Sequence, residues 1–329
     1  MQQPACPYAS KCGGCLYLDM PFDLYVQKKK DFIINSFMHA KIQLTLDNFI
    51  TIPFGTRRRA TFAFKKGIIG FNAPKSHQII PMDTAPCLTQ KLSSLLPQLK
   101  SLITQLNTRG DISLLDTPHG IDIHIKTGKE PPTLSIRMLL AEFASSPLIV
   151  RISYNNEPIL EKVPNLLPID AFLQPSVAGE EVLVQHTLSA LTDEKKVVDL
   201  FCGAGTFTIP LIQAGYQTIG YDSAKESVQR LGLNGVVRDL FRNPLSSQEL
   251  DQFDAVIMDP PRAGAKEQTK MLVSSQVKKI IMISCNPITA ARDSLELIKN
   301  GWQITKAIGI DQFIYTNHCE VFILFEKTI

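Results

Sequence analysis

A predicted strand runs into a turn with two glycines in the segment Val198-Asp199-Leu200-Phe201-Cys202-Gly203-Ala204-Gly205-Thr206-Phe207. Glycine lets the backbone approach a ligand closely, and open α/β sheets bind ligands at the carboxyl ends of their strands. Asp222 ends the next predicted strand, where a carboxylate can accept hydrogen bonds from ribose hydroxyls. Pro210 and Leu211 stand where a dinucleotide fingerprint has its third glycine. The motif therefore predicts a nucleoside-type ligand, and it leaves dinucleotides and S-adenosylmethionine both open.

Apolar runs on either side place this turn in a parallel sheet. From about residue 177, runs that are typical of buried strands alternate with helical segments, at 197–201, 218–221, 255–258 and 280–283. Such alternation predicts a parallel sheet with helices on both faces. A last apolar run, Val321–Phe325, is expected to close the sheet.

The middle of the chain has a different pattern, with short strands and tight turns. Thr61–Phe64 and Ile68–Phe71 predict a hairpin, and a helix is expected near 90–106. Between residues 121 and 126, isoleucines alternate with polar residues, which predicts one buried and one solvated face. We therefore expect a cysteine-bearing segment at 1–47, an antiparallel β-rich domain at 48–170 and an α/β domain at 171–329.

Composition limits the class of protein. The chain has 329 residues, of which 44% are hydrophobic and 20% charged, enough for two packed domains. No apolar run is long enough to span a membrane, and the first residues show no secretory signal, so a cytoplasmic location is expected. The first hundred residues hold 13 basic and 5 acidic side chains. This excess predicts an anionic partner such as nucleic acid, or simply a solvated basic surface.

Two motifs follow the third and fourth predicted strands. Asp259-Pro260-Pro261-Arg262 fixes a carboxylate and a guanidinium beside the glycine turn, unless it is an ordinary strand-ending turn. In Ser284-Cys285-Asn286-Pro287, Asn286 fits an N-cap and Pro287 the first helical position. Cys285 would then lie near a helix N-terminus, whose dipole favours the reactive thiolate. The alternative is a buried and inert cysteine.

A third motif, His318-Cys319-Glu320, precedes the last strand. A carboxylate that enters an apolar strand is either a general base with a raised pKa or a solvated strand end.

Seven cysteines and no export signal argue against a disulfide framework. Cys6, Cys12 and Cys15 are closely spaced, and Cys87 is a distant fourth thiol. Four thiolates can ligate zinc or an iron–sulfur cluster, and the spacing alone does not choose between them.

Taken together, these motifs resemble the RNA uracil-C5 methyltransferases, which make 5-methyluridine. The resemblance rests on Phe172-Leu173-Gln174, the glycine turn, Asp259-Pro260-Pro261-Arg262, Ser284-Cys285-Asn286-Pro287 and His318-x-Glu320, in this order. The N-terminal cysteines are similar to those of the iron–sulfur branch, which includes bacterial 23S ribosomal RNA enzymes. Many ribosomal RNA members carry an N-terminal TRAM domain, whereas here the cysteine pattern begins at residue 6, so a member without that domain is implied.

The resemblance implies a class I, Rossmann-like methyltransferase domain and specific roles for residues. Cys285 matches the family's nucleophile, which adds to C6 of uracil, and Glu320 matches the general base that removes the C5 proton. The implied S-adenosylmethionine contacts are Gln174, Phe201, Gly203, Gly205, Thr206, Asp222, Asp239 and Asp259. The implied ligands of a [4Fe–4S] cluster are Cys6, Cys12, Cys15 and Cys87. Asp239 follows Asp222 after only 16 residues, a shorter segment than the family usually has.

The same resemblance implies an RNA partner, no membrane and a monomeric enzyme. Arg262 is a candidate donor to the uracil O4. Basic residues of the antiparallel domain, Arg57, Arg58, Arg59, Lys65 and Lys66, are expected to contact the RNA backbone. Ribosomal RNA is the favoured substrate, and transfer RNA is the alternative substrate. The alternative classes of protein are a DNA cytosine-C5 methyltransferase and a cluster-containing RNA-binding protein without catalysis.

Overall fold

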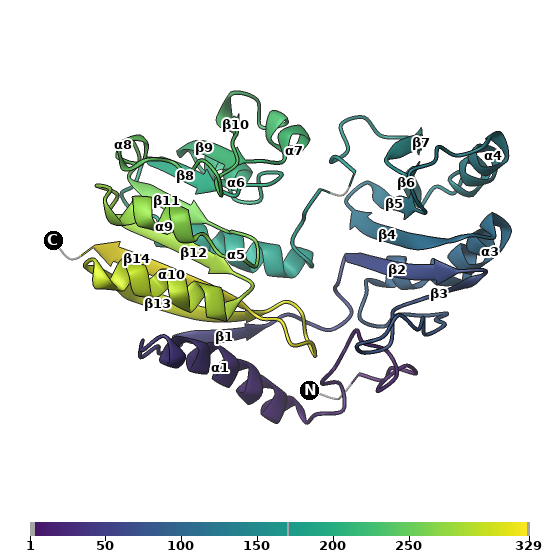
Figure 1. Cartoon of the computed structure of the whole chain (residues 1–329), viewed down its shortest axis with the longest axis horizontal. Coiled ribbons are helices and arrows are strands. Elements are labelled where there is room, and N and C mark those ends of the chain that lie inside the picture. Colours follow the sequence, from purple (N-terminus) through teal and green to yellow (C-terminus); the bar gives the residue numbers. More distant parts are fainter. Residues whose placement is uncertain (1–3, 170, 328–329) are drawn as a thin grey trace.

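The computed structural model describes residues 4–169 and 171–327 and contains two β-sheets (Figure 1). The larger sheet has eight strands, which in spatial order are β1 (Asn48–Thr51), β13 (Trp302–Asp311), β14 (Glu320–Lys327), β12 (Lys279–Ser284), β11 (Ala255–Met258), β8 (Lys196–Leu200), β9 (Gln217–Asp222) and β10 (Gly235–Val237). Strand β14 is antiparallel to both of its neighbours, and the other pairs in this sheet are parallel. The predicted parallel sheet is therefore confirmed.

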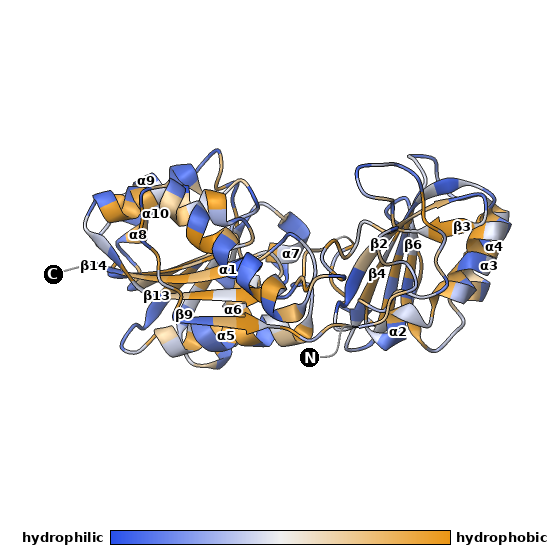
Figure 2. Ribbon diagram, turned by 90° about the horizontal axis from the view of Figure 1, so that it is seen from below, coloured by the Kyte–Doolittle hydropathy of each residue, from blue (hydrophilic) through white to orange (hydrophobic). Residues whose placement is uncertain are grey.

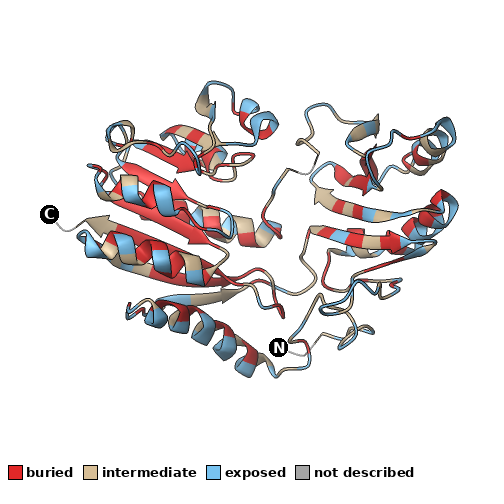
Figure 3. Cartoon of the chain, viewed as in Figure 1, coloured by how far each residue is buried: buried red, intermediate tan, exposed pale blue. Residues whose placement is uncertain are grey.

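Helices cover both faces of the larger sheet (Figure 2). One face packs against α1 (Phe22–His39), α8 (Ser247–Leu250), α9 (Lys266–Val273) and α10 (Pro287–Lys299). The other face packs against α5 (Val177–Ala190) and α6 (Thr208–Gln213). The short α7 (Lys225–Gln229) and a single 3-10 turn (Gly232–Asn234) lead into β10. Because both faces are covered, β11 is apolar throughout, β12 is apolar between Lys279 and Ser284, and both strands are buried (Figure 3).

The smaller sheet has six strands, in the order β3 (Ile68–Gly70), β2 (Arg59–Lys65), β4 (Arg109–Thr117), β5 (Gly120–Lys126), β6 (Ile149–Tyr154) and β7 (Glu157–Glu161). Its apolar face packs against the helices α2 (Gln90–Ser93), α3 (Leu96–Leu106) and α4 (Leu134–Phe143). The predicted hairpin is β2–β3, and the helix expected near 90–106 is α2 followed by α3. All pairs are antiparallel except β5 with β6.

The second face of β5 is less solvated than the alternating pattern predicts. Arg151 on the neighbouring strand β6 is 4% exposed and forms an ion pair with Asp122. His124 is 5% exposed, and its Nδ1 lies 2.9 Å from the hydroxyl of Ser153. The polar side chains of β5 are therefore paired with β6, because a parallel neighbour that the local pattern does not reveal supplies partners for them.

Two elements lie elsewhere than the sequence predicts. Asn48–Thr51, expected in the antiparallel domain, pairs in parallel with Ile308–Asp311 of β13 and so extends the larger sheet. Helix α1 lies within the segment 1–47, where the sequence analysis predicts no helix, and packs its Ile33 and Phe37 into the same core as α10. The final strand does not close the edge of the sheet, because β14 is inserted between β12 and β13. The proposed limits 1–47, 48–170 and 171–329 therefore cut across these long-range contacts.

The two sheets meet through Arg58, which comes directly before β2. Its guanidinium donates to the carbonyl of Gln174 (2.8 Å) and to the carboxylate of Glu180 on α5 (2.5 Å). Its backbone N–H donates to the carbonyl of Pro175 (2.8 Å). Arg58 is 6% exposed. The expectation that Arg58 contacts RNA is therefore wrong, since its donors are used inside the protein.

Among the described residues, no helix has the length and apolar character that a membrane crossing requires.

Candidate active site

The carboxyl ends of the parallel strands bring the three predicted motifs to one edge of the larger sheet. Strand β14 runs in the opposite direction, so it begins at the edge where β12 ends. Ser284 pairs with Val321 in this antiparallel ladder. Cys285 follows Ser284 and Glu320 precedes Val321, so continuing the same register brings Cys285 opposite Glu320. The candidate nucleophile and base are thus placed by strand register, although they are 35 positions apart in sequence.

A cavity of about 420 Å³ opens at this edge. Its lining comprises Phe172, Gln174, Phe201, Cys202, Gly203, Ala204, Thr206, Phe207, Asp222, Asp259, Pro260, Pro261, Arg262, Cys285, Phe313, His318 and Glu320. Both proposed catalytic residues therefore share one cavity with six of the eight proposed S-adenosylmethionine contacts. The cavity is large enough for a cofactor and a base, and apolar and aromatic walls with a few polar groups are typical of ligand sites.

The glycine turn forms one end of the cavity. Gly203 has a φ of +54°, and a Cβ built on it would meet no atom within 4 Å, so a side chain there would project into open space. Its N–H donates to the carboxylate of Asp222 (3.0 Å), which also accepts from the N–H of Ala224 (2.8 Å). Phe201 adopts a left-handed φ of +65°, which turns the chain out of β8. This end offers bare backbone and a carboxylate, as a nucleoside site requires.

Two glutamines connect the carboxylates at the centre of the cavity. The amide of Gln174 donates to Asp259 (3.0 Å), and its oxygen accepts from the amide of Gln312 (2.8 Å). Gln312 also hydrogen-bonds to Glu320. Asp259 and Glu320 are therefore held in a single network that spans the cofactor end and the catalytic end of the cavity.

Burial dominates the electrostatics of these two carboxyl groups. Desolvation raises the pKa of Glu320 to about 7, although its hydrogen bond to Gln312 and the charges of Arg262 and Lys29 oppose the shift. Desolvation, with the negative charge of Glu320, raises the pKa of Asp259 well above its usual range. Glu320 is 4% exposed, which excludes the alternative of a solvated strand end. Its burial raises the pKa in the direction that a general base at this place would require.

Cys285 does not have the acidic thiol that its place before a helix predicts. Asn286 is the N-cap of α10, and its side chain accepts from Ile288, as expected. Desolvation and the charges of Glu320 and Asp259 nevertheless raise the pKa of Cys285 to about 11, against the lowering effect of Arg262. Burial and these two charges thus shift the pKa of the Cys285 thiol in the direction opposite to the one that its place before α10 predicts.

Arg262 and His318 face each other at the mouth of the cavity. The Arg262 Nη2 lies 2.6 Å and 2.9 Å from the two ring nitrogens of His318. Desolvation, then the charge of Arg262, lowers the pKa of His318 to about 4, so the imidazole is neutral at physiological pH. The carbonyl of Arg262 accepts from Asn286 (3.0 Å), which fixes this loop against α10.

Two proposed cofactor contacts do not line the cavity. Gly205 has a φ of +94°, and a Cβ built on it would lie 2.7 Å from a methyl group of Leu231, so its role here is backbone shape and packing. The carboxylate of Asp239 accepts from the N–H groups of Phe241 (3.0 Å) and Arg242 (3.3 Å) in its own turn. Both assignments remain proposals.

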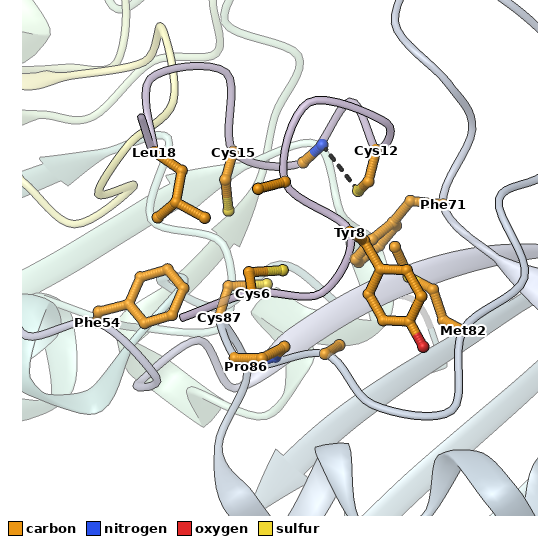
Figure 4. A pocket seen from close by; sticks show the side chains of 13 residues that line it. Cys6, Tyr8, Cys12, Cys15, Leu18, Phe54, Phe71, Met82, Pro86 and Cys87 are labelled. Carbon is orange, nitrogen blue, oxygen red and sulfur yellow. Dashed lines mark hydrogen bonds between the residues drawn. The ribbon is translucent and has the colours of Figure 1, made fainter. Parts of the chain in front are cut away.

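Three thiols of the N-terminal segment, Cys6, Cys12 and Cys15, line a separate pocket together with Cys87 (Figure 4). Figure 4 shows Cys6, Cys15 and Cys87 turned toward one another, and Cys12 on the wall, where its Sγ accepts from the N–H of Gly14 (3.2 Å). A hydrogen bond between Cys15 and Cys87 raises the pKa of Cys15. Within residues 4–169 and 171–327, no three histidine, cysteine, aspartate or glutamate side chains are arranged to hold a metal ion. The donor set is that of an iron–sulfur cluster, although the described sulfurs are not arranged around a single metal ion.

Some residues of the site escaped the sequence interpretation. Phe313 lines the cavity and Gln312 links its carboxylates, but both lie in a loop without a local motif. Arg57, expected at the RNA backbone, stacks its guanidinium over the ring of Phe313 at 5.7 Å. In the sequence, their position shortly before His318-x-Glu320 was the one feature that could have indicated a place in the site.

Comparisons with known proteins show which family the chain is similar to. Residues 235–328 match the family of tRNA (uracil-5-)-methyltransferases. An uncharacterized RNA methyltransferase of Agrobacterium fabrum is 30% identical, over 96% of this chain and 82% of its own. The 23S rRNA (uracil(1939)-C(5))-methyltransferase RlmD of Shewanella sediminis is also 30% identical, over 98% of this chain and 82% of its own.

The fold is also found in a solved structure. The chain is similar to the tRNA (uracil-54, C5)-methyltransferase of Pyrococcus abyssi, which was solved with S-adenosyl-L-homocysteine. The superposition has a TM-score of 0.71 at 20% identity, and it covers 98% of this chain and 87% of the Pyrococcus abyssi chain. This likeness confirms the class I, Rossmann-like methyltransferase fold. With the relatives above, it confirms the resemblance found in the sequence: the chain belongs to the RNA uracil-C5 methyltransferase family.

Proposed function

We propose that the protein transfers a methyl group from S-adenosylmethionine to C5 of uridine in ribosomal RNA, with Cys285 as nucleophile and Glu320 as general base. One observation carries the proposal: strand register brings these two side chains together in the cavity whose other end is the glycine turn. Neither a binding module nor a dinucleotide enzyme needs a thiol opposite a buried carboxyl at this place.

The residues at the glycine turn fit the cofactor. Asp222 is suited to the ribose hydroxyls, and bare backbone at Gly203 leaves room for the amino-acid part. Gln174 and Asp259 are fixed by each other and can orient the cofactor toward Cys285. The sulfonium methyl of S-adenosylmethionine supplies the electrophile when it is bound.

Cys285 makes uracil nucleophilic. The thiol first loses its proton to solvent; the thiolate then adds to C6, and the electron pair of the C5–C6 bond moves toward C5 and O4. Arg262 lies where it lowers the pKa of Cys285, and its guanidinium can donate to the developing charge on O4. C5 then attacks the methyl carbon, the bond between this carbon and the sulfonium sulfur breaks, and S-adenosylhomocysteine leaves. The product of this step is a C5-methylated ring that is still bonded to the Cys285 sulfur.

Glu320 completes the reaction. Its carboxylate takes the proton from C5, the C5–C6 double bond forms again, and the bond between C6 and the Cys285 sulfur breaks. A group with a pKa of about 7 is well matched to this step, because it is a stronger base than an ordinary carboxylate and is still ionised in about half of the molecules at neutral pH.

The target uridine must leave its stack to reach this cavity. Next to the cavity is a second hollow, which shares His318 with it and is also lined by Arg57, Lys75 and Asn72. Arg57 and Lys75 are suited to phosphates of the flanking nucleotides. Lys65 lies at the other end of β2, about 20 Å further along a seven-residue strand, so we assign it and Lys66 a smaller share of the RNA contact.

We prefer ribosomal RNA to transfer RNA because the RlmD relatives of Tolumonas auensis and Shewanella sediminis, named for 23S rRNA, cover almost the whole chain. The family that matches residues 235–328 is named for tRNA, which keeps transfer RNA as the second candidate. The same ribosomal substrate supports a cytoplasmic location.

We also propose that Cys6, Cys12, Cys15 and Cys87 hold a [4Fe–4S] cluster. Four thiols in a pocket walled by apolar side chains such as Tyr8 and Phe54 support it, because thiolates are the ligands of such clusters. When bound, the cluster would join the N-terminal segment to residue 87. Anaerobically purified protein is then expected to be brown and to contain iron and sulfide; bound zinc in their place would contradict the assignment.

The function is tested by trapping the intermediate. RNA with 5-fluorouridine at the target cannot lose a proton from C5, so a covalent complex with the wild-type protein is expected in the presence of S-adenosylmethionine. Cys285→Ser is expected to form none and to leave 23S rRNA unmethylated. Methylation of transfer RNA alone would support the second candidate, and no methylation of either RNA would refute the proposal.

A further inference from the structure

The loop that carries part of the catalytic site is in contact with helix α1 through hydrogen bonds. Residues 312–319, here called the catalytic loop, join β13 to β14. They include Phe313 and His318, which line the cavity, and Gln312, which links Gln174 to Glu320. The position of this loop therefore controls the geometry around the general base.

Lys29 of α1 is a charged side chain buried beneath this loop. It is 2% exposed, and its ammonium lies 2.9 Å from the carboxylate of Asp311, which is fully buried at the end of β13. The same ammonium donates to the carbonyl oxygen of His318. Lys29 thus binds the two ends of the catalytic loop at once. A lysine on an amphipathic helix normally keeps its charge in water, so its burial here calls for specific partners.

Tyr25, one turn earlier on α1, binds the middle of the loop. Its hydroxyl donates to Asp311 and accepts from the N–H of Tyr315 (2.7 Å), and the two tyrosine rings lie 4.9 Å apart. Tyr315 has a φ of +62°, a left-handed conformation that a residue with a Cβ rarely adopts. Its carbonyl accepts from the N–H of Tyr17 (3.0 Å). Such a backbone persists only where its surroundings hold it.

We propose that Lys29 and Tyr25 are positioning residues for catalysis: through Asp311, Tyr315 and the His318 carbonyl they hold the catalytic loop so that Glu320 and His318 face Cys285. This inference rests on the proposed function. It makes α1 a part of the active site, although the helix precedes Cys285 by about 250 positions. It also explains why Tyr25 and Lys29 are buried on α1, a helix that packs into the core of the larger sheet through its apolar residues Ile33 and Phe37.

The test separates positioning from folding stability. Lys29→Met alone leaves Asp311 without its cation and is expected to lower stability as well as activity. Lys29→Met/Asp311→Asn removes both charges, so no unpaired ion remains and the stability is expected to recover toward that of the wild type. We expect kcat for RNA methylation to stay reduced on the order of 10²-fold in this double variant, because misplacement of a reacting group has that effect. Its Kd for S-adenosylhomocysteine is expected to remain unchanged.

Tyr25→Phe provides a second route, since it keeps the ring and removes the hydroxyl. Faster hydrogen exchange at residues 312–319 and slower adduct formation with 5-fluorouridine RNA are expected. Lys299→Met, at the exposed far end of α10, is the matched control and is expected to match the wild type in every assay.

Recovery of kcat together with stability in the double variant would overturn the inference, because Lys29 would then serve folding only. Faster loop exchange in Tyr25→Phe without any loss of activity would overturn it as well. If the wild-type protein methylates no RNA, the proposed function fails, while loop exchange still tests whether α1 holds the loop.

Discussion

At the scale of single residues, the cavity holds a thiol and a carboxyl whose environments oppose ionisation of both. Glu320 is 4% exposed, and burial is the main reason that its pKa rises to about 7. Burial and the charges of Glu320 and Asp259 raise the pKa of Cys285 to about 11. In the proposed reaction the thiol must lose its proton, and Arg262 is a cation whose charge favours the thiolate.

Glu320→Gln is expected to separate methyl transfer from product release. Without a base the C5 proton stays, so the methylated adduct with Cys285 accumulates on ordinary uridine RNA, and turnover falls about 10²–10⁴-fold. Denaturing gel electrophoresis of enzyme–RNA complexes, with the methyl group labelled, measures both effects. Glu326→Gln, near the other end of β14, is the control; product release at the wild-type rate in Glu320→Gln would exclude Glu320 as the base.

The pH dependence of kcat/KM follows from the same carboxyl group. Because the pKa of Glu320 is raised to about 7, the base is protonated below that pH and ionised above it, so activity should increase as the pH rises through about 7. A rate profile over about pH 6 to 9 should show this inflection in the wild type. Persistence of the same inflection in the residual activity of Glu320→Gln would assign it to another group.

At the scale of elements, the sequence predicts strands and motif positions well because these depend on local patterns. Apolar runs located β8, β9, β11 and β12, and Asn286-Pro287 located the start of α10. The pairing of β1 with β13 was not predictable, since strands that meet across more than 250 positions leave no local signature. The insertion of β14 between β12 and β13 was not predictable either, because an apolar run shows that a strand is buried and does not show which strands it pairs with. The direction of the pKa shift of Cys285 was not predictable from its local motif, because burial in the cavity and the charges of Glu320 and Asp259 on other strands set it.

Arg58 is the element-scale link between the two sheets, and its loss should affect the cofactor site. Arg58→Ala leaves the Gln174 carbonyl and Glu180 without their donor, so we expect a loss of about 1–3 kcal/mol in the free energy of unfolding. Because Gln174 then loses its support, the Kd for S-adenosylhomocysteine should rise. Urea unfolding and calorimetric titration measure the two effects. Unchanged cofactor affinity in a destabilised Arg58→Ala variant would show that the junction does not support the site.

At the scale of the whole molecule, basic side chains lie near the cavity in the smaller sheet, its turns and α1. Arg57 and Lys75 line the hollow beside the cavity, and Lys29 of α1 pairs with Asp311. The excess of basic residues in the first hundred positions is therefore divided. Some of these charges are committed to internal contacts, as those of Arg58 and Lys29 are, and others, such as that of Lys75, are exposed. Composition alone could not separate the two groups.

Lys75→Ala should weaken RNA binding through the loss of a phosphate contact. If the variant loses one phosphate contact on a single-stranded segment, the plot of the logarithm of the RNA association constant against the logarithm of the salt concentration should become less steep by about 0.7. Filter binding at several salt concentrations measures it, with kcat at saturating RNA expected to stay unchanged. Lys299→Ala serves as the surface control; equal salt slopes for Lys75→Ala and wild type would remove Lys75 from the RNA path.

The central claim is that the Cys285 sulfur bonds to the uracil ring, and mass spectrometry of the trapped complex tests it most directly. After digestion of a wild-type complex with 5-fluorouridine RNA and S-adenosylmethionine, we predict a single modified peptide that contains Cys285 and carries the methylated, fluorinated nucleotide. The Cys319→Ala protein should give the same peptide. A nucleotide on any other residue, or full methylation of uridine RNA by Cys285→Ala, would contradict the account.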